Sequence, residues 1–460
     1  MTAPACTVFF LPGLGLDAAA ALPLIAELDA RFRVIGIDLP GQGGSEDAPD
    51  GSVDAQVDAA VAVIERDADG GPWLLCAHSM GGKIAARIAQ RVRDGEVAAF
   101  GLMGLVLLAP SPPRPEPLPD EKRVEMLSWV ADGPISEDDA RTFVQDNVGA
   151  SLPEVWERDV VDTVRTMSPV AWRRWLEQGS KEDLAASIGV LDLPCVVLGG
   201  DADELLGASA QPTLLADVYP RARFVTLPGA GHLLSYERPE AVAAAISEIW
   251  EGIEEQRAPV PAEWGRLIAS PRTTPRVRST LARRALADAP DYEPRALTRT
   301  QLDLLRSIAD RLVPQPDSGR VDIAARVDAE LAAGGGDGWR PTDALSDDEA
   351  YRQGLDDLAA SWDEDPDAAL EAVLAGEGVA GGAGDGESLR RWFQDVRVDL
   401  TREWLIHPAS LARIGYDGFA TGAEDVAFAG YRTLKAGVRD DWEPSDLGRP
   451  APHEQTGSDA

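Results

Sequence analysis

A serine between an apolar run and a helical pattern is the first residue in this chain whose surroundings favour nucleophilic chemistry. Ser79 stands in the run WLLCAHSMGG, residues 73–82, after four residues that predict a buried strand. Apolar residues recur at helical spacing over residues 84–89, so a helix directly follows the turn. Ala77 and Gly81 are small, which lets the strand and the helix approach closely. This context predicts a nucleophile elbow that exposes the serine hydroxyl.

A serine hydroxyl is a poor nucleophile by itself and needs a base from elsewhere in the chain. Of the four histidines, His232 lies in the Gly-rich run GAGH after the last apolar strand, where a loop can carry an imidazole over the elbow. His78 lies inside the elbow, where we expect local packing, and His407 and His453 lie in the second half. We therefore expect His232 to act as general base and general acid.

Three carboxylates compete for the role of orienting this imidazole. Asp201, Asp203 and Glu204 all follow the apolar run at residues 195–199. The selected carboxylate would hold the imidazole tautomer and stabilise the imidazolium ion. The residues alone leave the choice open.

These side chains need a scaffold that brings distant segments together. Over residues 1–255, short and nearly continuous apolar runs alternate with amphipathic helical patterns, which predicts a parallel sheet with helices on both faces, an α/β fold. The expected strands span residues 8–11, 32–38, 73–76, 105–109, 195–199 and 223–227.

The alternation stops at about residues 111–193. A proline-rich start there precedes helical segments that contain Trp129, Trp156, Trp172 and Trp175. An insertion of this size between two core strands predicts a helical cap over the carboxyl ends of the strands, where open α/β sheets bind ligands. We expect these tryptophans to form the core of the cap, with a substrate-lining role as the alternative.

Five motifs of the first half resemble the α/β-hydrolase fold family over about residues 6–255. They read FFLPGLGLD, DLPGQGGS, AHSMGG, LGGDADEL and LPGAGHLLSYERPE, in the family's order. The chain departs from the pattern at Ala77, where the family has glycine, and at Pro12, where a histidine usually precedes the oxyanion glycine. The resemblance implies Asp203, with Asp201 as runner-up, for the acid, and the order Ser, Asp, His is the family's order.

The resemblance also implies an oxyanion site made of the backbone N–H groups of Leu14 and Met80. A serine at the elbow argues against dehalogenase and epoxide hydrolase chemistry. We therefore expect a serine hydrolase that cleaves an ester or a lactone through an acyl-serine intermediate, without a cofactor or a metal. Cleavage of a C–C bond is an alternative, because the fold alone does not fix the substrate.

Composition limits the partners and the compartment. The 460 residues carry a formal net charge of −35, so we do not expect a nucleic-acid partner. No apolar run approaches the roughly 18 residues of a membrane span, and no secretory or twin-arginine leader is visible. The three cysteines form no CxxC pair and are expected to be small buried groups. These features predict a cytoplasmic protein without membrane insertion.

The chain is long enough for two domains, and its composition changes after residue 255. Arginines among prolines and threonines predict a linker over residues 256–295. A capping box at Thr298 and Gln301 then begins the helical patterns of a small all-α domain, residues 296–438. We expect a flexible Gly-rich loop at residues 376–386, a helix cap at His407 and a disordered tail at residues 439–460.

Three stretches of this second domain resemble the gluconate 2-dehydrogenase subunit 3 family over about residues 296–436. They read LTRTQLDLLRSIADRLVPQPDSG, YRQGLDDL and HPASLARIGYDGFATGAEDVAFAGYRTL. The resemblance implies an accessory partner of a flavin-dependent sugar oxidoreductase, without a redox centre of its own. One alternative for the whole chain is therefore a binding subunit whose hydrolase half is a docking scaffold. A narrower enzyme hypothesis is a lactonase that opens the oxidised sugar.

Overall fold

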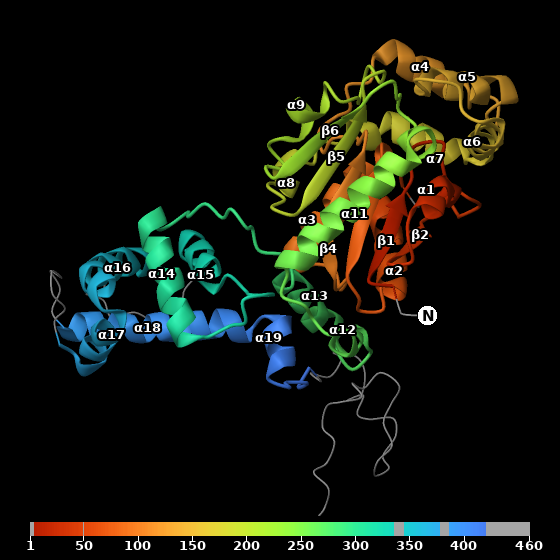
Figure 1. The fold of residues 1–460 in the computed structure, drawn as a ribbon. Helices are drawn as coiled ribbons and strands as arrows, with labels where there is room; N and C mark the ends of the chain where they lie inside the picture. Colours follow the sequence, from red (N-terminus) through yellow and green to blue (C-terminus); the bar gives the residue numbers. More distant parts are fainter. Residues whose placement is uncertain (1–3, 49, 335–344, 378–385, 420–460) are drawn as a thin grey trace, which may run out of the picture. The chain divides into compact units, whose positions relative to one another are not determined.

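The computed structural model describes residues 4–48, 50–334, 345–377 and 386–419, which form two compact units (Figure 1). The first unit holds the residues up to 254 together with 260–287, and the second holds 255–259 and 288–416. The tail expected at residues 439–460 and most of the expected Gly-rich loop lie outside the described residues.

A six-stranded parallel sheet forms the centre of the first unit, which confirms the expected α/β class. The strands are β1 (Cys6–Leu11), β2 (Phe32–Gly36), β3 (Trp73–His78), β4 (Leu102–Leu108), β5 (Cys195–Gly200) and β6 (Ala222–Leu227). They pair in the order β2-β1-β3-β4-β5-β6. Every residue of β1, β3, β4 and β5 is buried, because helices cover both faces and these strands are apolar except for Thr7 and His78.

Helices flank the sheet on both sides. The helix α3 (Met80–Arg93) packs against β1, β3 and β4 and against α2 (Val53–Asp67), whereas α11 (Pro239–Gln256) passes in front of the sheet in Figure 1. The first unit also contains four shorter helices: η1 (Ala18–Ala21), α1 (Leu22–Glu27), α9 (Gln211–Leu215) and α10 (Leu234–Glu237).

The chain between β4 and β5 folds into a run of helices. They are α4 (Asp120–Ser128), α5 (Glu137–Asn147), α6 (Glu154–Thr166), α7 (Pro169–Glu177), η2 (Gly179–Lys181) and α8 (Ala185–Ile188). Trp172 is fully buried among them, donates its indole N–H to the carbonyl of Met126 at 2.9 Å and contacts Phe143 edge-on. The expectation that tryptophans form a core in this insertion is confirmed for Trp172.

The segment expected to be a linker contains two helices that belong to the first unit. These are α12 (Ala262–Ala269) and α13 (Pro275–Arg284), and α13 packs against α3. Thr274 caps α13 through its side chain, and Pro275 occupies the first helical position, where its missing N–H is harmless. Composition predicted a linker here, yet Trp264, Leu267 and Ile268 of α12 lie three and four residues apart, which is helical spacing.

The second unit is helical, as expected. It contains α14 (Arg299–Leu312), α15 (Ile323–Ala332), α16 (Asp347–Glu364), α17 (Pro366–Ala375), α18 (Gly386–Leu405) and α19 (Pro408–Arg413). The capping box of Thr298 and Gln301 starts α14, and His407 caps α19 by accepting the N–H of Ala409 at 3.2 Å. Its core residues with the least exposure include Leu302, Leu305, Ile308, Leu355, Leu358, Phe393, Val396 and Leu400.

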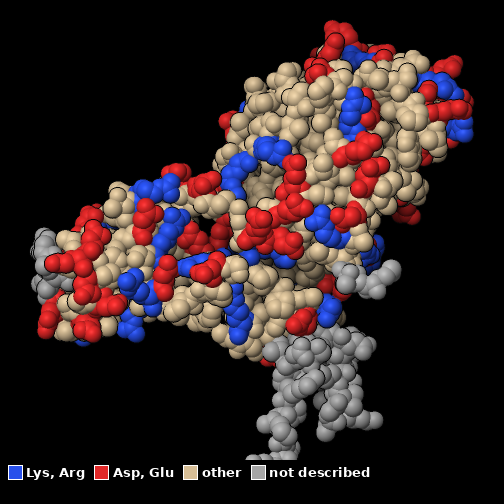
Figure 2. All heavy atoms as spheres, in the orientation of Figure 1, with Lys and Arg blue, Asp and Glu red and all other residues tan. Residues whose placement is uncertain are grey.

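Acidic side chains are spread over the surface of both units, with arginines and lysines scattered among them on the face drawn in Figure 2. Many of these form ion pairs, such as Arg87 and Arg91 with Asp54. No helix within the described ranges is long and apolar enough to span a membrane.

Candidate active site

Ser79 occupies a strained turn between β3 and α3. Its backbone has φ 50° and ψ −118°, which is uncommon for a residue with a side chain. The turn is tight because α3 approaches β1 closely: a Cβ added to Gly81 would lie 2.5 Å from the carbonyl oxygen of Leu11. The main-chain N–H of Ser79 donates to Leu108 at 2.9 Å, which anchors the turn to β4.

Loops that follow two other strands bring a histidine and a carboxylate to this serine. The Nε2 atom of His232 lies 2.9 Å from Ser79 Oγ, and its Nδ1 atom lies 2.6 Å from Asp203 Oδ2. The other oxygen of Asp203 accepts the N–H groups of Leu205 and Leu206, each at 3.0 Å. The structure thus brings together Ser79, Asp203 and His232 in one hydrogen-bonded chain.

The two competing carboxylates lie elsewhere. Asp201 is exposed and accepts the N–H of Gly229 at 2.7 Å. This hydrogen bond stabilises the start of residues 228–232, the loop that carries His232 and is called the histidine loop below. Glu204 is also exposed. Neither forms the hydrogen bond to the imidazole that Asp203 forms.

The electrostatics of the pair favour an ionised Asp203. Burial opposes the charged carboxylate, but the charge and the hydrogen bond of His232, with the two backbone donors, lower the pKa of Asp203 to about 2. Burial by itself would lower the pKa of His232, but the Asp203 carboxylate more than compensates and raises it above its ordinary value. His232 therefore holds a proton more readily than a free histidine, as a base that must accept one from Ser79 requires.

His78 connects the elbow to the histidine loop. Its Nε2 atom lies 2.8 Å from the backbone carbonyl oxygen of His232, and because a carbonyl only accepts, Nε2 carries the hydrogen and donates it. Burial, reinforced by the neighbouring His232, lowers the pKa of His78 to about 3, so this imidazole is neutral. The sequence predicted only local packing for His78, but its polar contact reaches a loop far away in the chain.

The expected oxyanion donors lie beside the serine. The loop after β1 approaches so closely that a Cβ on Gly13 would lie 3.0 Å from the Cβ of Ser79. Leu14, the next residue, lines the same cavity as Ser79 and His232. Met80 is the first residue of α3, where the N–H groups have no helical acceptor. Gln42 steadies the loop by donating to the Gly13 carbonyl at 3.0 Å.

A cavity of about 150 Å³ opens over these groups. From the strand ends it is lined by Leu14, His78, Ser79, Asp203, Leu205, Leu206, His232 and Leu233. From the inserted segment it is lined by Glu116, Pro117, Leu118, Lys122, Met126, Phe143, Asp146, Asn147, Trp175 and Leu176. Mostly apolar walls with a few convergent polar groups are typical of small-molecule sites.

Comparison with known proteins shows the family of this chain. Residues 8–245, more than half of the chain, match the sequence model of the alpha/beta hydrolase family. The chain belongs to that family. It is a hydrolase enzyme, and the resemblance expected over residues 6–255 is confirmed at the family level.

Curated relatives of this hydrolase carry an esterase name. The chain is 26% identical over 235 residues to a pimeloyl-acyl-carrier-protein methyl ester esterase of Nitrosomonas europaea, covering 49% of this chain and 88% of that one. A protein of the same name from Neisseria meningitidis is 23% identical, covering 54% of this chain and 94% of that one.

Solved structures with a similar fold include an esterase from Thermogutta terrifontis, with a TM-score of 0.46, 25% identity and coverage of 55% of this chain and 92% of that one. An enol-lactonase from Burkholderia xenovorans has a TM-score of 0.44, 23% identity and coverage of 55% and 92%.

Sequence reasoning missed a buried lysine that fixes the inserted segment of this hydrolase to the elbow helix. Lys83 is fully buried on α3 and donates to the carbonyls of Gly179, Ser180 and Glu182 at 3.0, 3.3 and 3.0 Å. Burial lowers the pKa of Lys83 to about 8. The signal in the sequence was a lysine within an otherwise apolar helical face, four residues after the serine.

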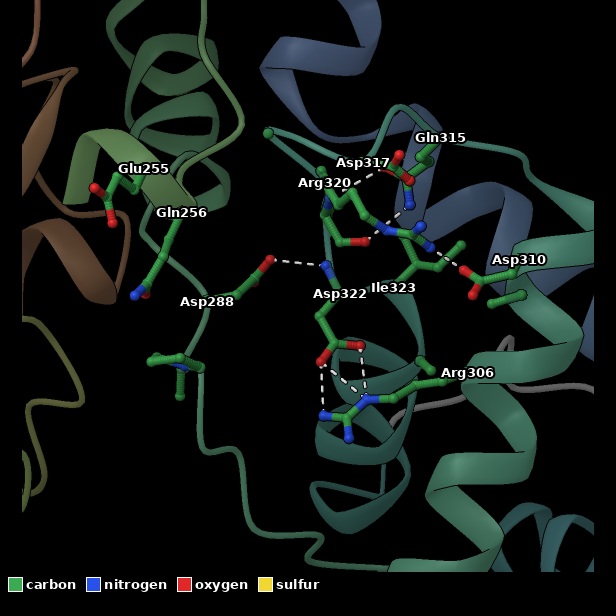
Figure 3. Close-up of a pocket in the computed structure, with 16 residues that line it drawn as sticks. Glu255, Gln256, Asp288, Arg306, Asp310, Gln315, Asp317, Arg320, Asp322 and Ile323 are labelled. Atoms are coloured by element: carbon green, nitrogen blue, oxygen red, sulfur yellow. Dashed lines mark hydrogen bonds and ion pairs between the residues drawn. The ribbon is translucent and has the colours of Figure 1, made fainter. Parts of the chain in front are cut away.

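A second hollow, of about 450 Å³, lies in the second unit (Figure 3). Its charged groups bond to each other: Arg306 donates to Asp322, Arg320 pairs with Asp310, and Asp288 accepts the N–H of Asp322. No serine, cysteine or histidine lines it. In the part of the chain that the structure describes, no group of His, Cys, Asp or Glu is arranged to hold a metal ion. The charged groups of this hollow are thus engaged with one another.

Proposed function

We propose that this hydrolase cleaves a carboxylic ester through an acyl-serine intermediate. The observation that carries the proposal is the hydrogen-bonded chain from Asp203 through His232 to Ser79 at the floor of a cavity. The ester names of the curated relatives support the substrate class. A lactone, which is an internal ester, is the second candidate, since the same steps open it.

In the first half of the proposed reaction, Ser79 Oγ attacks the ester carbonyl carbon while His232 Nε2 takes the hydroxyl proton. Negative charge that develops on the carbonyl oxygen is stabilised by the N–H groups of Leu14 and Met80, each worth about 3 kcal/mol by comparison with similar sites. When the carbon–oxygen bond breaks, the His232 Nε2–H protonates the departing alcohol.

In the second half, water replaces the alcohol. His232 Nε2 takes a proton from the water, the hydroxide adds to the acyl carbon, and the bond to Ser79 Oγ breaks as this oxygen regains a proton from His232. Asp203 stays ionised throughout and stabilises the imidazolium in both halves. The net reaction consumes one water and yields one carboxylic acid and one alcohol.

Hydrolysis of p-nitrophenyl butyrate tests this assignment. We expect Ser79→Ala to lower kcat by about 10⁴-fold or more, because the nucleophile is lost. The matched control is Ser187→Ala, which should leave kcat unchanged. The Ser187 hydroxyl is exposed and donates to the Leu184 carbonyl at 2.9 Å, and it does not line the cavity. Full activity in folded Ser79→Ala would exclude Ser79 as the nucleophile.

We further propose that the two domains have separate roles, as the sequence predicts. The first is a catalytic domain with a cap at about residues 111–193, and the second is a helical accessory domain from residue 296. The three stretches resembling the gluconate 2-dehydrogenase subunit 3 family support the accessory role, with a flavin-dependent oxidoreductase as partner. A reducing compartment such as the cytoplasm fits the buried thiols of Cys6, Cys76 and Cys195.

Affinity purification of the whole chain from its native cells tests the accessory role. We expect a flavin-containing protein to be retained equally by the wild type and by Ser79→Ala, because the proposed partner binds through the helical domain. Purification without any flavoprotein would contradict the accessory role and leave the esterase proposal intact.

A further inference from the structure

Glu116 places a carboxyl group in the wall of the active-site cavity. It lies in the proline-rich segment after β4, where its N–H donates to the carbonyl of Ser180 at 2.8 Å. At the start of the same segment, the N–H of Ser111 donates to the carbonyl of Ser79 at 2.8 Å. The segment that carries Glu116 is thus tied to the nucleophile on one side and to the inserted helices on the other.

The basic side chains around Glu116 are committed to other groups. Lys83 directs its three N–H donors at three backbone carbonyls, and Arg123 donates to the Leu176 carbonyl and the Ser180 hydroxyl. Among the residues that the structure describes, Glu116 forms no ion pair. Nearby positive charge therefore acts on this carboxylate only at a distance.

Lys122 is the lysine that lines the cavity itself, and carboxylates balance its charge. Lys122 pairs with Asp146 at 2.6 Å and with Glu125 at 2.9 Å. The carboxyl groups of Glu116, Asp146 and Asp203 therefore outweigh the one lysine among the lining residues. A second negative charge brought in by a substrate would be repelled, whereas a positive charge would be attracted.

Burial raises the pKa of Glu116, against the opposing effects of Ser111, Lys83, His232 and Arg123. Glu116 is only partly exposed and lacks an ion-pair partner among the described residues, so its carboxylate has lost part of its hydration. A hydrogen-bond donor from the cavity side would offset this loss. A substrate can supply that donor, because Glu116 and Ser79 line the same cavity.

We propose that Glu116 is a specificity-determining residue that selects esters carrying an ammonium or hydroxyl group and disfavours esters carrying a free carboxylate. This inference rests on the proposed ester hydrolysis at Ser79. It assigns the polar end of the substrate to the part of the cavity wall that Glu116, Pro117 and Leu118 form.

Four methyl esters of six-carbon acids test the proposal, because they differ only in the terminal group: ammonium, hydroxyl, methyl or carboxylate. Hydrolysis is followed by proton release in the wild type, in Glu116→Gln and in Glu121→Gln. Glu121 is exposed and does not line the cavity, so its variant makes the same chemical change outside the site.

We expect the wild type and Glu121→Gln to prefer the ammonium ester over the carboxylate ester by about tenfold or more in kcat/KM, as expected for one unscreened charge contact. Glu116→Gln should bring this ratio close to one while still cleaving the methyl-terminated ester. An unchanged ratio in Glu116→Gln, or a wild-type preference for the carboxylate ester, would overturn the proposal.

A second measurement separates this inference from the proposed function. A fluorophosphonate probe labels an activated serine, and bound ester slows that labelling even when turnover is too slow to follow. Labelling slowed most by the ammonium ester, in the wild type but not in Glu116→Gln, supports the role of Glu116. Labelling slowed equally by all four esters overturns that role alone, whereas absence of wild-type labelling overturns the hydrolase site and this inference with it.

Discussion

The carboxylate of Asp203 and the imidazole of His232 each change the proton affinity of the other. The hydrogen bond of 2.6 Å between them lowers the pKa of Asp203 and raises the pKa of His232. Because the general base works only when it is neutral, the raised pKa of His232 sets the acid limit of the proposed reaction. Asp203 therefore influences both the rate and the pH range of hydrolysis.

Replacing Asp203 by asparagine should change both properties. We expect kcat to fall by about 10³–10⁴-fold, because asparagine cannot hold the productive tautomer or stabilise the imidazolium. The wild-type acid limb of kcat/KM should lie above the ordinary histidine pKa of about 6.5. In the variant it should move to lower pH, because burial lowers the pKa of His232 and the strongest opposing group, the Asp203 carboxylate, is gone.

A pH–rate profile of both proteins checks these expectations, with Asp201→Asn as the matched control. Asp201 bonds the N–H of Gly229 and not the imidazole, so its variant should keep the wild-type acid limb. An acid limb that moves in Asp201→Asn but stays in Asp203→Asn would assign the orienting role to the other carboxylate.

At the scale of elements, close approach of α3 to the sheet is what creates the elbow. Gly81→Ala should destabilise the first unit by about 1–3 kcal/mol, because the new methyl group would collide with the Leu11 carbonyl. Gly252→Ala is the matched control on α11, where an added Cβ meets nothing within 4 Å. That change should stabilise the protein by about 0.5–1 kcal/mol, since alanine favours a helix.

Chemical denaturation of the two variants measures both effects. The two variants should also differ in the rate of ester hydrolysis. The displaced elbow of Gly81→Ala would move Ser79 away from His232 and slow the reaction, whereas Gly252→Ala should hydrolyse esters at the wild-type rate. Equal stability of the two variants would show that α3 can retreat from β1 without cost.

The sequence was most informative where one feature served both local structure and chemistry. The strands were predictable because strands covered on both faces are nearly continuous in apolar residues, and the elbow was predictable because Ala77 and Gly81 flank the serine in a strand–helix context. The 2.9 Å between Ser79 Oγ and His232 Nε2 is a contact between segments far apart in the sequence. The choice of Asp203 over Asp201 came from a family pattern and not from the residues themselves.

Contacts between segments far apart in the chain could not be predicted from the sequence. Nothing in the local pattern shows that His78 donates to the His232 carbonyl or that Lys83 binds three carbonyls near residue 180. Both are buried polar side chains, on β3 and α3. Their partners are backbone carbonyls, which every residue has, so the sequence does not show which residue is the partner. The helices α12 and α13 were missed for another reason, since the prolines and arginines of residues 256–295 suggested a linker although both helices have buried apolar residues.

At the scale of the whole molecule, the residues proposed for catalysis all lie in the first unit, whereas the second has a hydrophobic core of its own. Leu355→Ala removes a fully buried side chain from that core and should destabilise the second unit by about 2–5 kcal/mol. Leu374→Ala, 51% exposed on α17, is the control and should change stability by less than about 0.5 kcal/mol.

Hydrogen exchange of the whole chain locates the effect of Leu355→Ala. Protection should fall in α14, α16 and α18, while ester hydrolysis stays at the wild-type rate. A loss of hydrolysis that parallels the loss of protection would show that the two units are energetically coupled.

Covalent capture of the serine tests the proposed chemistry most directly. The whole chain is treated with a fluorophosphonate, digested, and analysed by mass spectrometry beside Ser79→Ala. We expect a single adduct on the peptide that contains Ser79 in the wild type, and no adduct in Ser79→Ala, because only a serine activated by His232 reacts. An unlabelled wild type, or an adduct that persists in Ser79→Ala, would contradict the assignment of Ser79 as the nucleophile.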